Sequence, residues 1–203
     1  VVNNLYQFIA HMCPEATYGY APMSCPGLPN KSYDRLSDTD FRKKIVKGPE
    51  TTFAEFAPYT LVTDEAEFDS FAPYTFFKFR PAQGERVEYK VAGATILPLM
   101  RCEEMYFIEM EATAHFDEAT AWNQLYAFMA SRDSAYACMT QDLVEEIIFQ
   151  KGIEFWGEGI VMYDMKRLDM GIDSAYEGTN FDESGRFTTT GRLPWWTYCI
   201  PQD

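Results

Sequence analysis

The pattern of apolar and polar positions divides the chain into an irregular first half and a helical second half. From residue 96 to 116, and again from 118 to 132, apolar residues recur at three- and four-residue spacings, as is typical of helices that bury one side. The stretch 140–169 continues this pattern and predicts a third helix. It contains Gly157 and Gly159, so we expect the helix to bend there and resume to about residue 168.

Capping residues support these boundaries. Asp117 is suited to cap the second helix, and Thr140 or Asp142 the third, because short side-chain oxygens accept bonds from free N–H groups of the first turn. The short links between helices favour antiparallel packing. In the helix over 96–116, Ile108 lies on one apolar face and Phe107 on another, which predicts a helix wedged between neighbours.

Residues 1–95 give no long periodic pattern, because proline and glycine interrupt the chain every few residues. A short repeat occurs at 55–60 (EFAPYT) and 70–75 (SFAPYT). We interpret it as two similar turns with proline fixing φ and rings packing on the body. Residues 75–80 alternate and predict a short strand that pairs with 87–91 in a hairpin.

The fold class that follows is mainly α, with long irregular loops and at most a short β-hairpin. We expect one domain in three parts: a loop-rich, ligand-facing segment over 1–95, a core of three to four helices over 96–170, and a loop with an aromatic tail over 171–203. A chain of 203 residues buries roughly 70% of its unfolded surface, which is enough for one core. The chain opens VVNNLYQF, without an initiator methionine, and we expect it to be a fragment of a longer protein.

Charge and hydropathy exclude some classes of partner. The net charge of −14 is unfavourable for binding nucleic acid or an anionic membrane surface, since both need clustered Lys and Arg. No window approaches the roughly 18 consecutive apolar residues of a spanning helix. Of five cysteines, Cys13 and Cys25 bracket a turn-rich segment and are candidates for a disulfide, although the spacing does not require one.

The common catalytic and metal-binding motifs are absent from the sequence. There is no GxSxG, GxxxxGK[ST], HExxH or GxGxxG. The histidines are His11 and His115, and we interpret His115 as a hydrogen-bonded structural residue. No Cys/His set has the spacing of a zinc site. The sequence therefore predicts no metal, no cofactor and no catalytic residues.

Carboxylates are the remaining candidates for chemistry. Glu154 and Glu158 are four residues apart, and Glu104 and Glu111 are seven apart, while a glycoside hydrolase needs only two carboxyl groups across a cleft. Like charges four apart on a helix repel unless they are partnered. We therefore favour a structural ion-pair network between helices, made of Arg101, Glu104, Glu154, Glu158, Asp164 and Arg167.

Aromatic residues in the loops are the candidates for ligand binding. Tyr18, Tyr20 and Tyr33 lie in the irregular half, where binding residues concentrate. A tyrosine ring offers a flat apolar surface with a hydrogen-bonding edge, which suits the apolar face and polar rim of a sugar. The alternative is that each ring only holds its loop against the body.

Several stretches of the helical half resemble the SusD/RagB family of outer-membrane nutrient-binding lipoproteins. Residues 99–112 (LMRCEEMYFIEMEA) are similar to its R-x-E-E-x-Y-L-I-x-A-E-A helix, and 147–168 to its E-R-x-x-E-F-x-x-E-G-x-R-x-x-D-L-K-R segment. The closing LPWWTYCIPQD and the segment YDRLSDTDFRKKI also resemble family segments. The chain departs from the pattern at Gln150, Lys151 and Val161, so two cations of the family's buried ion-pair network are altered.

The resemblance implies a SusD-like domain with tetratricopeptide-like helix packing that captures glycans without catalysis. It implies a place on the surface of a Gram-negative outer membrane, held there by a lipid anchor that this chain lacks. The implied partners are a glycan and a SusC-like TonB-dependent transporter. Two alternatives remain open from the residues: a glycoside hydrolase that uses a carboxylate pair, and a helical protein-interaction module without a ligand of its own.

Overall fold

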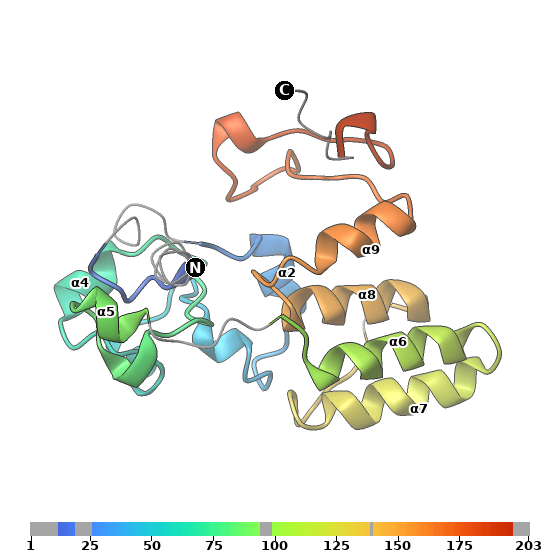
Figure 1. The fold of residues 1–203 in the computed structure, drawn as a ribbon, viewed down its shortest axis with the longest axis horizontal. Helices are drawn as coiled ribbons and strands as arrows, with labels where there is room; N and C mark the ends of the chain where they lie inside the picture. Colours follow the sequence, from blue (N-terminus) through green and yellow to red (C-terminus); the bar gives the residue numbers. More distant parts are fainter. Residues whose placement is uncertain (1–11, 19–25, 94–98, 139, 197–203) are drawn as a thin grey trace.

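The computed structural model describes residues 12–18, 26–93, 99–138 and 140–196 (Figure 1). Over these residues the protein is mainly α-helical, as the sequence predicts. The α-helices are α2 (Asn30–Arg35), α3 (Phe53–Phe56), α4 (Glu65–Ser70), α5 (Tyr89–Ala92), α6 (Cys102–Ala114), α7 (Glu118–Met129), α8 (Leu143–Glu154) and α9 (Val161–Arg167). Short 3₁₀ turns are η2 (Lys43–Ile45), η3 (Ala57–Tyr59), η4 (Ala82–Gly84), η5 (Glu183–Gly185) and η6 (Pro194–Trp196).

Helices α6, α7 and α8 pack around one apolar core, with α9 beyond α8 (Figure 1). The predicted caps are confirmed for two of them. Asp117 accepts a bond from the N–H of Thr120 at the start of α7, and Asp142 accepts one from the N–H of Glu145 at the start of α8. The core side chains are Phe107, Met110, Ala121, Leu125, Met129, Leu143, Ile147 and Phe155.

The predicted interruption after α8 is also confirmed. Gly157 and Gly159 have φ of 77° and 81°, a left-handed conformation that L-residues rarely adopt. The chain turns there and continues as α9.

The predicted helix over 96–116 is too long at its start. α6 begins at Cys102, because Arg101 is extended with φ −127° and ψ 153°. Residues 94–98 lie outside the described part of the chain. The prediction that α6 is wedged on two faces is also wrong, since Phe107 and Met110 are buried but Ile108 is 48% exposed.

The predicted hairpin between 75–80 and 87–91 does not form. Tyr89–Ala92 is helix α5, capped by the carboxylate of Glu88. Thr75 and Phe76 make isolated bridges to Gly27 and Val46 instead. Alternation failed as a guide here because Phe76 and Phe77 are both buried, at 1% exposure each, so consecutive side chains enter two different apolar clusters.

The FAPYT repeat is anchored by its phenylalanines as predicted, but its two copies are not similar turns. Ala57–Tyr59 forms η3 after a helical Phe56 (φ −88°, ψ −19°), whereas Phe71 is extended (φ −71°, ψ 136°). Phe56 and Phe71 are both buried, and their ring centroids lie 4.9 and 5.3 Å from that of Phe77. The two tyrosines differ, because Tyr74 has a left-handed φ of 69° and Tyr59 does not. The repeat therefore places its phenylalanines alike but its tyrosines in different settings.

The segment 12–18 is held by a buried carboxylate. Glu15 is fully buried and accepts bonds from the N–H of Leu61 at 2.5 Å and the hydroxyl of Thr60 at 2.8 Å. Cys13 is a free thiol, and Cys25, its suggested disulfide partner, lies outside the described residues. Burial raises the pKa of the Cys13 thiol to about 12, which keeps it protonated at neutral pH.

Candidate functional site

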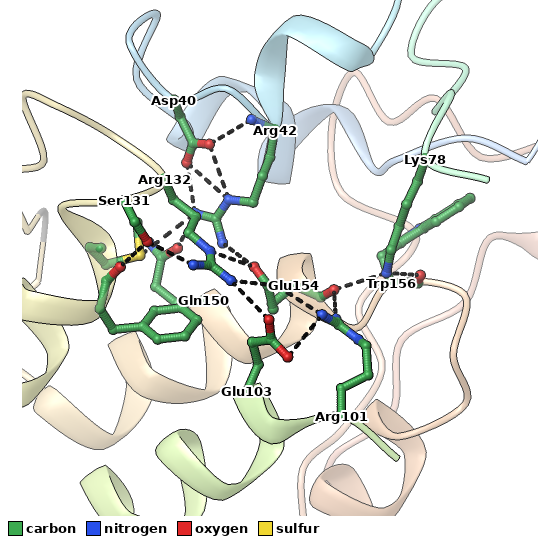
Figure 2. Close-up of polar contacts among 12 residues, drawn as sticks. Asp40, Arg42, Lys78, Arg101, Glu103, Ser131, Arg132, Gln150, Glu154 and Trp156 are labelled. Atoms are coloured by element: carbon green, nitrogen blue, oxygen red, sulfur yellow. Dashed lines mark hydrogen bonds and ion pairs between the residues drawn. The ribbon is translucent and has the colours of Figure 1, made fainter. Parts of the chain in front are cut away.

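A buried polar network links the loop-rich half to the helices, and its centre is Glu154 at the end of α8 (Figure 2). Its carboxylate lies 3.1 Å from a guanidinium nitrogen of Arg132, 3.3 Å from Arg101 and 3.7 Å from Arg42. Burial by itself would raise the pKa of Glu154, but these three cations, Arg132 foremost, hold that pKa below its usual value. A carboxylate kept ionised by three guanidinium groups joins segments and is poorly suited to act as a general acid.

Arg42 and Asp40 bring the loop-rich half into this network. Both are buried, at 3% and 1% exposure, and lie 2.7 Å apart. Arg42 also donates to the side-chain oxygen of Gln150 on α8 at 2.6 Å. These contacts fix the segment around 40–42 against α8 (Figure 2).

Glu158, which lies between the two glycines of the turn, extends the network. It accepts from Lys78 at 2.5 Å and from Arg101 at 2.9 Å. Lys78 also donates to the backbone carbonyls of Glu154 and Trp156, at 2.8 Å each. Burial lowers the pKa of Lys78, and Glu158 opposes that shift.

The structure brings together only some of the predicted network residues. Arg101, Glu154 and Glu158 are in direct contact. Asp164 and Arg167 pair with each other at 2.9 Å but belong to a separate group. That group also contains Lys151, 2.8 Å from Asp164, and Glu111, 2.5 Å from Arg167.

Glu104 has no ion pair among the described residues, and the prediction that included it is wrong. The neighbouring Glu103 takes that place, at 3.4 Å from Arg101 and 3.5 Å from Arg132. A helix rotates by about 100° per residue, so the sequence pattern alone left the choice between adjacent glutamates open. The departures at Gln150 and Lys151 are accommodated, because both side chains have partners within the two groups.

The candidate ligand site is an open cleft of about 610 Å³ on the loop-rich half. Two half-buried tyrosines line it, Tyr33 from α2 and Tyr59 from η3. Hydrogen-bonding and charged side chains surround them: Asp38, Lys43, Lys44, Glu50, Thr51 and Glu55. This combination of aromatic surface and polar rim is the one that the sequence argument expected for sugar binding.

Tyr33 is held firmly in the cleft wall. Its ring meets that of Tyr74 edge-on at 5.4 Å, and the ammonium group of Lys43 lies 4.8 Å from its centroid. Gly48 packs so closely against the Tyr33 hydroxyl that a side chain there would collide with it. The ring is therefore presented in one position.

Two of the three cleft carboxylates, Asp38 and Glu55, have partners that favour their ionised form. Asp38 pairs with Lys43 at 2.8 Å, and this hydrogen bond lowers the pKa of Asp38. Glu55 is part of a capping box with Thr52, whose N–H lowers the pKa of Glu55. A glycosidase acid needs a raised pKa, and both shifts run the other way.

Of the other predicted ligand residues, Tyr18 does not line this cleft. Tyr18 packs its ring beside Cys13 and Ala16 and lies 6.3 Å from the Tyr89 ring, away from the cleft lining. Tyr20 lies outside the described residues. Sequence reasoning missed Tyr59, although the FAPYT repeat marked it. It also missed Arg42, although the segment YDRLSDTDFRKKI that contains it resembles a family segment, and Arg132, for which the sequence offered no signal.

The described ranges show no metal-binding cluster and no membrane-spanning helix. They contain no cluster of three or more His, Cys, Asp or Glu side chains that could hold a metal ion. His115, predicted to be a structural residue, is exposed at the C-terminal end of α6. None of the described helices is long and apolar enough to cross a membrane.

Comparison with known proteins finds similarity at the level of the fold. No protein-family model matches the chain, and no curated protein matches its sequence. Among solved structures, it is similar to a SusD-like carbohydrate binding protein from Bacteroides vulgatus, with a TM-score of 0.57 and 22% sequence identity. The alignment covers 94% of this chain and 37% of that one. The described chain therefore has a SusD-like, mainly helical fold and spans little more than a third of the length of that neighbour.

Proposed function

We propose that the protein binds glycans without catalysis and serves nutrient uptake together with a SusC-like TonB-dependent transporter. The observation that carries the proposal is the cleft in which Tyr33 and Tyr59 stand among hydrogen-bonding side chains. The SusD-like fold supports the same function, since the similar solved structure is that of a carbohydrate binding protein.

The cleft favours a neutral or weakly charged oligosaccharide. Its charged groups have both signs, and two of them, Asp38 and Lys43, neutralise each other. The site is open and shallow, so we expect stacking on the tyrosines, a few hydrogen bonds and modest affinity.

Position in the cell and the transporter partner belong to the same proposal. The protein would be held at the outer-membrane surface of a Gram-negative cell by a lipid anchor on a longer chain. There it would pass bound oligosaccharide to the transporter. The acidic net charge of −14 is consistent with a ligand that is not a polyanion.

The test is retention of the protein in native affinity gels that contain polysaccharides, combined with an assay for released reducing ends. Retention on at least one polysaccharide without release of reducing ends is expected. Release of reducing ends would instead favour the glycoside hydrolase alternative. Co-purification of a transporter with no retention on any glycan would favour a protein-interaction module.

A further inference from the structure

A second pocket, of about 430 Å³, lies between α6 and α7, away from the tyrosine cleft. Its floor is apolar, formed by Met110, Ala127 and Phe128. The ring of Tyr106 stands at its edge and is 56% exposed. Tyr106 belongs neither to the ion-pair network around Glu154 nor to the lining of the tyrosine cleft.

The α6 wall of the pocket combines this ring with negative charge. Glu103, Tyr106 and Glu109 are three residues apart, so they share one side of the helix and all line the pocket. Glu103 is neutralised by Arg101 and Arg132. Glu109 has no ion pair among the described residues, and its one hydrogen bond there is from the amide of Gln124, at 3.4 Å.

On the α7 wall, the side-chain oxygen of Gln124 is a hydrogen-bond acceptor without a donor within the described ranges. Because the nitrogen of the Gln124 amide faces Glu109, its oxygen faces the other way, where it is buried and has no hydrogen-bond partner within the described ranges. Arg132 does not supply a competing free cation, since its charge is shared by Glu154 and Glu103 and its guanidinium lies 4.3 Å from the Phe128 centroid.

We propose that this pocket binds a primary ammonium group carried on a small flat body, as in an amino sugar. The ammonium group would pair with Glu109, and the face of Tyr106 would stabilise it by a cation–π contact. The apolar floor would take the uncharged side of the sugar ring. The choice of a sugar as the carrier rests on the proposed function, whereas recognition of the ammonium group does not.

The test is NMR titration of the full chain with D-glucosamine, N-acetyl-D-glucosamine and D-glucose. Glucosamine should shift the signals of Tyr106 and the side-chain amide of Gln124, and its affinity should fall as salt is added. The two uncharged sugars should leave these signals unchanged. Equal shifts from all three sugars, or none from glucosamine, would contradict the proposal.

Variants test whether the pocket is the binding site, and a lysine derivative tests whether the ligand is a sugar. Tyr106→Ala and Glu109→Gln should each weaken glucosamine binding by about two- to fivefold, whereas the exposed Glu177→Gln should not. Retained affinity in both pocket variants would overturn the proposal even if the cleft binds glycan. Tighter binding of Nα-acetyl-lysine amide than of glucosamine would overturn the assignment to a sugar.

Discussion

Arg42 donates a hydrogen bond of 2.6 Å to the side-chain oxygen of Gln150, between residues that are 108 positions apart in sequence. Both side chains are buried, at 3% and 4% exposure. The bond ties the segment that carries Lys43 and Lys44 to the rigid helix α8. The tyrosine cleft therefore has one wall anchored in the helical core, although all its lining residues belong to the loop-rich half.

Arg42→Met should destabilise the protein strongly. The change leaves the carboxylate of Asp40 buried without its partner and removes one of three cations from Glu154. Breaking a buried pair from one side costs about 3–5 kcal/mol, to be measured by urea unfolding. The exposed Lys44→Met is the matched control and should change the free energy of unfolding by less than about 0.5 kcal/mol. An equal loss in both variants would show that the network is not what stabilises this junction.

Stability should fall on acidification through protonation of Glu154. Its pKa is lowered in the folded protein, so its contribution is fully present above the unfolded value of about 4.3 and is lost as pH falls through the lower folded value. Urea unfolding from neutral pH to below pH 4 should therefore show a decline that starts near the unfolded pKa. Glu154→Gln should unfold more easily at neutral pH and show a shallower decline, and an unchanged slope would contradict this assignment.

Tyr59→Ala should weaken glycan binding with little loss of stability. The ring is half-buried at the cleft and touches the body mainly through Phe56, at a centroid distance of 6.3 Å. Loss of one stacking ring is worth about 1 kcal/mol, or about fivefold in Kd, measurable by calorimetry with the retained glycan. Tyr163→Ala, at a tyrosine that is 71% exposed on α9, should leave the affinity unchanged. A similar loss in both would show that Tyr59 does not contact the ligand.

Gly48→Ala should disturb the cleft through Tyr33. A methyl group at Gly48 would collide with the Tyr33 hydroxyl and with Thr51, so we expect a loss of about 1–3 kcal/mol and weaker glycan binding. Gly152→Ala is the control, because a methyl group there meets nothing within 4 Å. It lies inside α8, so it should stabilise the protein by about 0.5–1 kcal/mol. Thermal melts of the two variants should move in opposite directions.

Tyr18→Ala tests whether this loop tyrosine binds ligand or only holds its loop against the body. In the structure its ring packs beside Cys13 and Ala16, and burial raises the pKa of its hydroxyl to about 12. We expect a lower melting temperature, corresponding to about 1–3 kcal/mol, with unchanged glycan affinity. Weaker binding at an unchanged melting temperature would restore Tyr18 to the ligand site.

The sequence by itself determined the elements that depend on neighbours in the chain. Helices α7 and α8, their caps Asp117 and Asp142, and the turn at Gly157 and Gly159 all follow from local spacing and backbone preference. The anchored phenylalanines of the FAPYT repeat follow in the same way.

Only the tertiary structure decided which distant residues meet. Arg42, Arg101 and Arg132 come from three separate segments to one carboxylate, and no spacing within a segment encodes that meeting. The tertiary structure also decided that Glu103, and not Glu104, pairs with Arg101. It likewise decided that Tyr59, and not Tyr18, lines the cleft with Tyr33. Burial of charge and of aromatic rings depends on the whole packed chain, so the site became visible only when the loops were placed against α8.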